Sequence, residues 1–148
     1  MFECRSRVLI ADGDAWLRRH LNQRLLDVEV FADTAADVKD ALDRLAASQY
    51  GVVVLDLQLS GGPAERVLDA ISKLPLSARP VVLVLANRTN ARSLDVDIVQ
   101  IVLRKPCDVR QLAEIIESCA KNTPEPAQRT EPMIVPQLDA AQNEQAVN

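Results

Sequence analysis

Polar residues stand directly after several short apolar runs of this sequence, in positions where charged groups can carry out phosphate or metal chemistry. Asp12 and Asp14 follow the first run, Asp56 follows another, and Lys105 comes after a third. Carboxylates that share one hollow raise each other's pKa unless a cation offsets their charge. A lysine ammonium or Mg²⁺ supplies that charge, and two acids with one backbone carbonyl suffice for Mg²⁺.

These residues need elements that bring them together. Continuous Val, Ile and Leu runs are typical of strands buried on both faces. We expect strands over residues 8–11, 28–31, 52–55, 81–86 and 98–103. Apolar residues at helical spacing predict helices in between, over residues 15–25, 38–45, 63–74, 87–97 and 109–119. The pattern over 87–97 is the weakest, since it offers only Ala91, Leu94 and Val96 to a core.

Alternating strands and helices predict an α/β fold with a doubly wound parallel sheet and helices on both faces. In such folds, ligands bind beyond the carboxyl ends of the strands. Three carboxylates and one ammonium therefore converge there in the expected structure. Each acid alone also has a plain structural role, because Asp after a strand often forms a turn, and Asp14 suits the N-cap of a helix.

The combination is more specific than its parts, and it resembles the receiver domain of bacterial response regulators over roughly residues 5–121. The segments that carry the resemblance are Val8-Leu9-Ile10-Ala11-Asp12-Gly13-Asp14, Val53-Val54-Leu55-Asp56-Leu57-Gln58-Leu59-Ser60-Gly61 and Leu103-Arg104-Lys105-Pro106. The resemblance implies a flavodoxin-like sheet of five strands in the order 2-1-3-4-5. It also implies a role in a two-component phosphorelay.

By this resemblance, Asp56 accepts a phosphoryl group and Lys105 contacts it. Asp12, Asp56 and the backbone carbonyl of Gln58 hold Mg²⁺, and Asp14 is a further candidate ligand. The partners implied are a histidine kinase or phosphotransfer protein and a downstream protein, and a second copy of the chain is a further candidate. Such a domain accepts one phosphoryl group and is not a multiple-turnover enzyme.

Three positions depart from the pattern of the family. Gly13 replaces the second of two strand-one acids, which is usually the closer metal ligand. Leu85 or Ala86 stands where the fourth strand usually carries a Ser or Thr hydroxyl, and Val102 replaces an aromatic switch residue. These departures bring the affinity for Mg²⁺ into question. They also leave no obvious residue whose side chain would change conformation when the domain is phosphorylated.

Two other functions compete with phosphoryl acceptance. The same departures suit a degenerate receiver that acts as a phosphorylation-independent adaptor. Asp12-Gly13-Asp14 also resembles the Asp-x-Asp signature of haloacid-dehalogenase-type phosphatases, with Asp12 as nucleophile and Asp14 as acid and base. No paired-acid motif appears late in the chain, and little length remains for a substrate cap.

Composition narrows the class of protein further. The 148 residues carry a net charge of −4, which works against direct binding to nucleic acid. No apolar run is long enough to cross a membrane, so we expect a cytoplasmic protein that does not bind membranes. Cys4, Cys107 and Cys119 form no C-x-x-C pair and indicate neither disulfides nor zinc. The only histidine, His20, follows two arginines on a predicted solvated helix face.

The sequence changes character after residue 121. Residues 122–148 contain four prolines, four acids and one base, with no apolar period. This composition predicts a disordered, Pro-rich, acidic tail without an output domain. Its only apolar cluster is Met133-Ile134-Val135, which is either a short docking peptide or an incidental patch.

Overall fold

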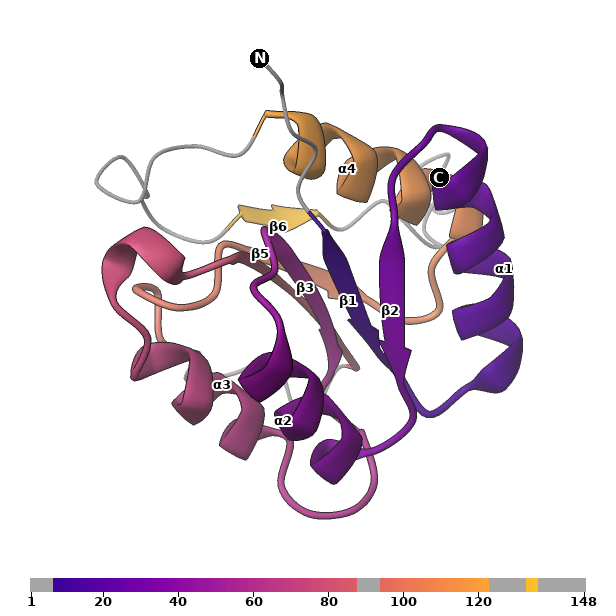
Figure 1. Ribbon diagram of the computed structural model, residues 1–148. Coiled ribbons are helices and arrows are strands. Elements are labelled where there is room, and N and C mark those ends of the chain that lie inside the picture. The colour runs from indigo at the N-terminus through magenta and orange to yellow at the C-terminus, as the bar shows by residue number, and fades with distance from the viewer. Residues whose placement is uncertain (1–6, 88–93, 123–132, 136–148) are drawn as a thin grey trace.

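The sheet is built from short apolar segments, because branched side chains pack well on a pleated surface covered on both sides. The computed structural model describes residues 7–87, 94–122 and 133–135. The strands are β1 (Val8–Ala11), β2 (Ala32–Ala35), β3 (Val52–Asp56), β4 (Val81–Ala86), β5 (Ile101–Arg104) and β6 (Met133–Val135). All pairings are parallel, and the sheet order is β2-β1-β3-β4-β5-β6 (Figure 1). The predicted order of the first five strands is confirmed.

Helices cover both faces of this sheet. They are α1 (Ala15–Asp27), α2 (Val38–Ala47), α3 (Glu65–Ser72) and α4 (Val109–Lys121), with a short 3₁₀ turn at Leu76–Ala78. Leu17, Leu21 and Leu25 of α1 share one core with Leu112 and Ile116 of α4. On the opposite face, α2 and α3 pack over a second core (Figure 1). The predicted doubly wound fold is therefore present.

The second strand lies later in the chain than predicted. Residues 28–31 form a turn in which the amides of Glu29 and Val30 donate to the carbonyls of Leu26 and Leu25, at 2.9 Å each. Glu29 has φ of 63°, so this is the Schellman motif that ends many helices. The helix end uses these backbone groups, and β2 begins only at Ala32.

The segment before β5 also differs from expectation. The helix predicted over 87–97 falls mainly on residues 88–93, which lie outside the described residues, and Leu94–Asp97 are not helical. The amides of Ile98 and Val99 donate to the Asp95 carbonyl at 3.0 and 2.9 Å. This turn delays the start of β5 to Ile101, instead of the predicted residue 98.

The region predicted as a tail contains one strand. The backbone of Met133–Val135 pairs with β5 in the register Ile101↔Met133, Val102↔Ile134 and Leu103↔Val135. The apolar cluster is therefore part of the sheet, and the five predicted strands become six. The domain limits of 5–121 and 122–148 stay a prediction, because the rest of residues 123–148 is outside the described part. Within that part, no helix is long and apolar enough to span a membrane.

Candidate functional site

The strand pairing places two carboxylates side by side. In the register of β1 and β3, Ala11 lies opposite Leu55, so the residues that follow them, Asp12 and Asp56, reach the same edge of the sheet. β5 ends at the same edge, and Lys105 follows its last residue. Because the strands are parallel, their carboxyl ends bring these three side chains to the same edge of the sheet.

The three side chains form one buried cluster. Lys105 Nζ donates to Asp12 Oδ2 at 3.0 Å and to Asp56 Oδ2 at 3.2 Å. Asp12 is 0% exposed and Asp56 is 6% exposed, whereas the Lys105 side chain is 27% exposed. One ammonium therefore bridges two carboxylates, and its own exposure keeps the cluster accessible from solvent.

The electrostatics of the cluster follow from its burial. Desolvation and the neighbouring Asp56 raise the pKa of Asp12, outweighing the Asp14 amide and Lys105, which lower it. Burial alone lowers the pKa of Lys105, but the two carboxylates overcome this effect, and the pKa is raised overall. Lys105 therefore remains charged beside the two acids.

Each carboxylate is also oriented by a nearby amide. The Asp14 amide donates to Asp12 Oδ1 at 2.9 Å, and the Gln58 amide donates to Asp56 Oδ1 at 3.0 Å. All four carboxylate oxygens therefore accept at least one protein hydrogen bond each. A carboxylate oxygen can accept two hydrogen bonds, so these bonds between described residues do not use up the acceptor capacity of either acid.

Asp14 does not join the cluster. Its Oδ1 accepts from the amides of Trp16 at 2.9 Å and Leu17 at 3.3 Å, which makes it the N-cap of α1. Nowhere among the described residues do three or more His, Cys, Asp or Glu side chains gather as a metal site. The carboxylates that could hold a cation at this edge are therefore those of Asp12 and Asp56, and the Gln58 carbonyl stays a predicted ligand.

Gly13 leaves space at this edge. A Cβ built on Gly13 would meet only the Ala36 carbonyl oxygen, at 4.0 Å. Beside it, Arg18 Nη1 donates to the Asp12 carbonyl at 2.8 Å. This contact was not predicted from the sequence. The only feature of the sequence that indicates it is an arginine in the first turns of the helix that follows Asp12.

Strand β4 contributes backbone groups to the site instead of a hydroxyl. The Leu85 carbonyl accepts from the Leu57 amide at 3.0 Å, and the Ala86 carbonyl accepts from the Lys105 amide at 2.9 Å. Neither side chain has a donor, and both are buried. Val102, at the expected aromatic position, is also buried, at 5% exposure.

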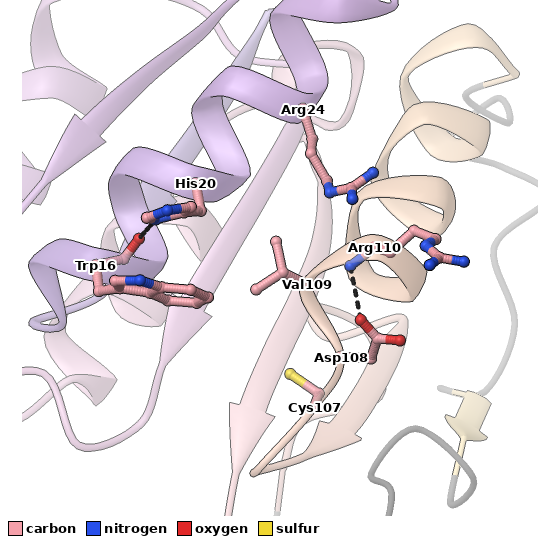
Figure 2. A pocket seen from close by; sticks show the side chains of 7 residues that line it. All are labelled: Trp16, His20, Arg24, Cys107, Asp108, Val109 and Arg110. Atoms are coloured by element: carbon pink, nitrogen blue, oxygen red, sulfur yellow. Dashed lines mark hydrogen bonds between the residues drawn. The ribbon is translucent and has the colours of Figure 1, made fainter.

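A separate hollow of about 480 Å³ lies between α1 and the start of α4, lined by Trp16, His20, Arg24, Cys107, Asp108, Val109 and Arg110 (Figure 2). The Trp16 and His20 rings stack with centroids 4.0 Å apart. His20 is exposed, in agreement with the solvated position predicted for it. None of the three residues of the acid-lysine cluster lines this hollow.

A doubly wound sheet with two acids and a lysine at its carboxyl edge defines the class of protein. The model of the response regulator receiver domain family matches residues 8–117. The chain belongs to this family, whose members act in two-component signalling.

Solved structures agree on the fold. A CheY-like receiver domain from Methylobacillus flagellatus is 20% identical with a TM-score of 0.65, covering 78% of this chain and 98% of the other. CheY4 of Vibrio cholerae is 19% identical with a TM-score of 0.67, covering 76% and 97%. The response regulator TrrA from Thermotoga maritima, in complex with Mg²⁺ and BeF, is 22% identical with a TM-score of 0.64, covering 76% and 97%. No curated protein matches the chain.

Proposed function

We propose that this receiver domain accepts a phosphoryl group on Asp56 and signals through contacts with other proteins. The observation that carries the proposal is the bridge from Lys105 to both Asp56 and Asp12, at 3.2 and 3.0 Å. A carboxylate is a weak nucleophile toward an anionic phosphate. An adjacent ammonium offsets the charge that the phosphoryl oxygens bring.

The proposed reaction is a phosphoryl transfer between two proteins. An Asp56 oxygen attacks phosphorus, and the bond from phosphorus to the imidazole nitrogen of a phosphohistidine breaks. The electron pair of that bond stays on the nitrogen, and the product is an acyl phosphate on Asp56. Lys105 then moves part of its hydrogen bonding from the carboxylates to the phosphoryl oxygens.

Asp12, Asp56 and the Gln58 carbonyl are the groups that would hold Mg²⁺ in this reaction. Bound Mg²⁺ would neutralise charge on the phosphoryl oxygens, and the Lys105 ammonium would add to this effect. The hydrogen bonds between described residues leave acceptor capacity on both acids, but Gly13 supplies no third carboxylate and Asp14 caps α1. We therefore propose weak Mg²⁺ binding in the free protein.

The phosphoryl donor would be a histidine kinase or a phosphotransfer protein, and the readout would be a downstream protein. We place the protein in the cytoplasm, where such kinases present their phosphohistidine. The transfer is stoichiometric, so Asp56 would carry at most one phosphoryl group per chain.

Intact-mass spectrometry after incubation with acetyl phosphate and Mg²⁺ tests the proposal. We expect one added phosphoryl group on the wild type and none on Asp56→Asn. Asp69→Asn is the matched control, because Asp69 is an exposed carboxylate on α3 that pairs with Lys73. An adduct that persists in Asp56→Asn, or no adduct on the wild type, would refute the assignment.

A phosphorylation-independent adaptor is the second candidate function. It is favoured by the locked Asp14 cap, by the absence of a donor on Leu85 and Ala86, and by the aliphatic Val102. An adaptor would form no acyl phosphate, and Asp56→Asn would leave its partner binding unchanged. The phosphatase alternative loses its acid and base, since Asp14 Oδ1 is engaged by two amides of α1.

A further inference from the structure

The outer strand β2 and the strand β5, which is next to the other edge of the sheet, are protected in different ways. β2 carries Asp33, which pairs with Arg7 at 3.2 Å and accepts from the Tyr50 hydroxyl at 2.6 Å. Charge on an edge strand discourages pairing with other chains. β5 has no charge before Arg104, and its Ile101, Val102 and Leu103 are all buried. The edge of β5 is instead covered by β6.

The connection from β5 to β6 is unusual in its hand. From β1 to β2 the chain moves one way along the sheet, over the face that carries α1. From β5 to β6 it moves the opposite way over the same face, which also carries α4. Two crossovers that run in opposite directions over the same face of a sheet have opposite handedness.

The crossover from β3 to β4 has the same hand as the one from β1 to β2. From β3 to β4 the chain moves in the same direction as from β5 to β6, but over the face that carries α3. About 98% of such crossovers are right-handed, and α4 lies on the face that gives the step from β5 to β6 the opposite hand. Among the described elements, β6 contacts mainly β5.

That pairing is short. Three residues of β6 are in register with β5, and Pro132 and Pro136 flank them in the sequence. Proline has no amide hydrogen to donate, which limits how far a strand can extend. Main-chain hydrogen bonds give such strand pairings their affinity, so a segment that pairs over more residues would compete with this strand.

From these observations, we infer that the outer edge of β5 is a docking site for an extended apolar segment parallel to β5. In the isolated protein its occupant is the chain's own Met133–Val135. A partner would carry at least three consecutive apolar residues in extended form, and it would pair over more residues if no prolines flanked them. Binding of such a partner requires release of the tail strand. This inference does not depend on phosphorylation of Asp56.

Hydrogen exchange of the full chain tests the resident strand. Ile134→Pro removes one amide donor from β6, and Val147→Pro makes the same chemical change outside the strand. We expect exchange in a peptide spanning Ile101–Arg104 to become about tenfold faster in Ile134→Pro and to stay unchanged in Val147→Pro. Unchanged protection of β1 and α1 would show that the fold is intact. Equal protection of β5 in both variants would overturn the inference.

Binding in trans tests the docking site itself. A synthetic peptide of residues 131–137 is titrated by NMR into full-length wild type and Ile134→Pro. We expect it to bind the variant at least about tenfold more tightly, because the tethered competitor is lost. A peptide with proline at position 134 is the control and should not bind. Equal binding to both proteins, or no binding to either, would overturn the docking site.

Sedimentation velocity identifies the chain that supplies the strand. We expect the wild type and Ile134→Pro both to sediment as monomers at micromolar concentration. A wild-type dimer that Ile134→Pro dissociates would assign β6 to a second copy and overturn the intramolecular arrangement.

Discussion

At the scale of single residues, the central feature is that two buried carboxylates share one ammonium. The raised pKa of Asp12 means that folding disfavours its ionised form. Stability from this group is therefore lost as the pH rises from 3.8 through its raised pKa. Lys105 acts in the opposite sense, because its raised pKa contributes stability below pH 10.5 that is lost above the folded-state value.

Lys105→Met should destabilise the protein by roughly 3 kcal/mol at pH 7, since it leaves two buried acids without a cation. The loss should shrink at acidic pH, where protonation of Asp12 relieves the repulsion. Urea unfolding at pH 7 and at acidic pH measures both the loss of stability and its reduction. Lys73→Met is the control, because that lysine is 75% exposed and its pair with Asp69 should contribute less than about 1 kcal/mol. Equal losses for the two variants would contradict this account.

Gly13→Asp should tighten Mg²⁺ binding by about tenfold or more, because it adds a third carboxylate at a position with open space. Isothermal titration calorimetry with Mg²⁺ measures the affinity. Gly13→Asn has the same shape without the charge and should gain much less. A similar gain for both substitutions would point to backbone rigidity as the cause.

At the scale of elements, residue patterns predicted the buried strands well and the polar boundaries less well. β1, β3 and β4 start and end within one residue of their predicted positions, because each is a continuous apolar run bounded by turn residues. β2 was placed too early, because Val28, Val30 and Phe31 favour a strand by type. The backbone of these residues instead forms the turn that ends α1. Glycine usually occupies the positive-φ position of such a turn, but here Glu29 occupies it.

The meeting of Asp12, Asp56 and Lys105 was predictable because parallel topology alone brings strand ends together. The engagement of Asp14 as a cap was also foreseen as its structural role. The strand at Met133–Val135 was not predicted, since three residues between prolines have no periodicity to read. Its placement depends on the free edge of β5, which is a tertiary feature.

Glu29→Gly should stabilise the protein by about 0.5–1 kcal/mol, because glycine adopts φ of 63° without the steric cost that a Cβ brings. Urea denaturation measures the change in the free energy of unfolding. Glu29→Ala removes the same charge but keeps the Cβ, so it should give no such gain. A stabilisation of equal size in both variants would assign the effect to charge.

At the scale of the whole molecule, the site joins two cores that face opposite sides of the sheet. Strands β1, β3 and β5 contribute to both cores, so the acid-lysine cluster lies where the two layers meet. The usual hydroxyl and aromatic side chains that would move between states are replaced by Leu85 or Ala86 and by Val102, which are all buried. The side chains at these positions next to the cluster are therefore aliphatic and well packed.

Beryllofluoride with Mg²⁺, a phosphoryl mimic, should raise the melting temperature without a change of conformation far from the site. Binding to the folded state alone stabilises it by mass action. Hydrogen exchange should change near Asp56 and Lys105 but not in α2 or along α4. Asp56→Asn is the control and should show no shift in melting temperature. Altered exchange along all of α4 would reveal a switch that uses other residues.

The stacked rings of Trp16 and His20 have a practical consequence. The chain has one tryptophan and one histidine, and their centroids are 4.0 Å apart. Fluorescence emission from this indole therefore reports on the position of the imidazole stacked against it. An emission change on adding a ligand includes any change in this stacking, and His20→Gln would separate the two signals.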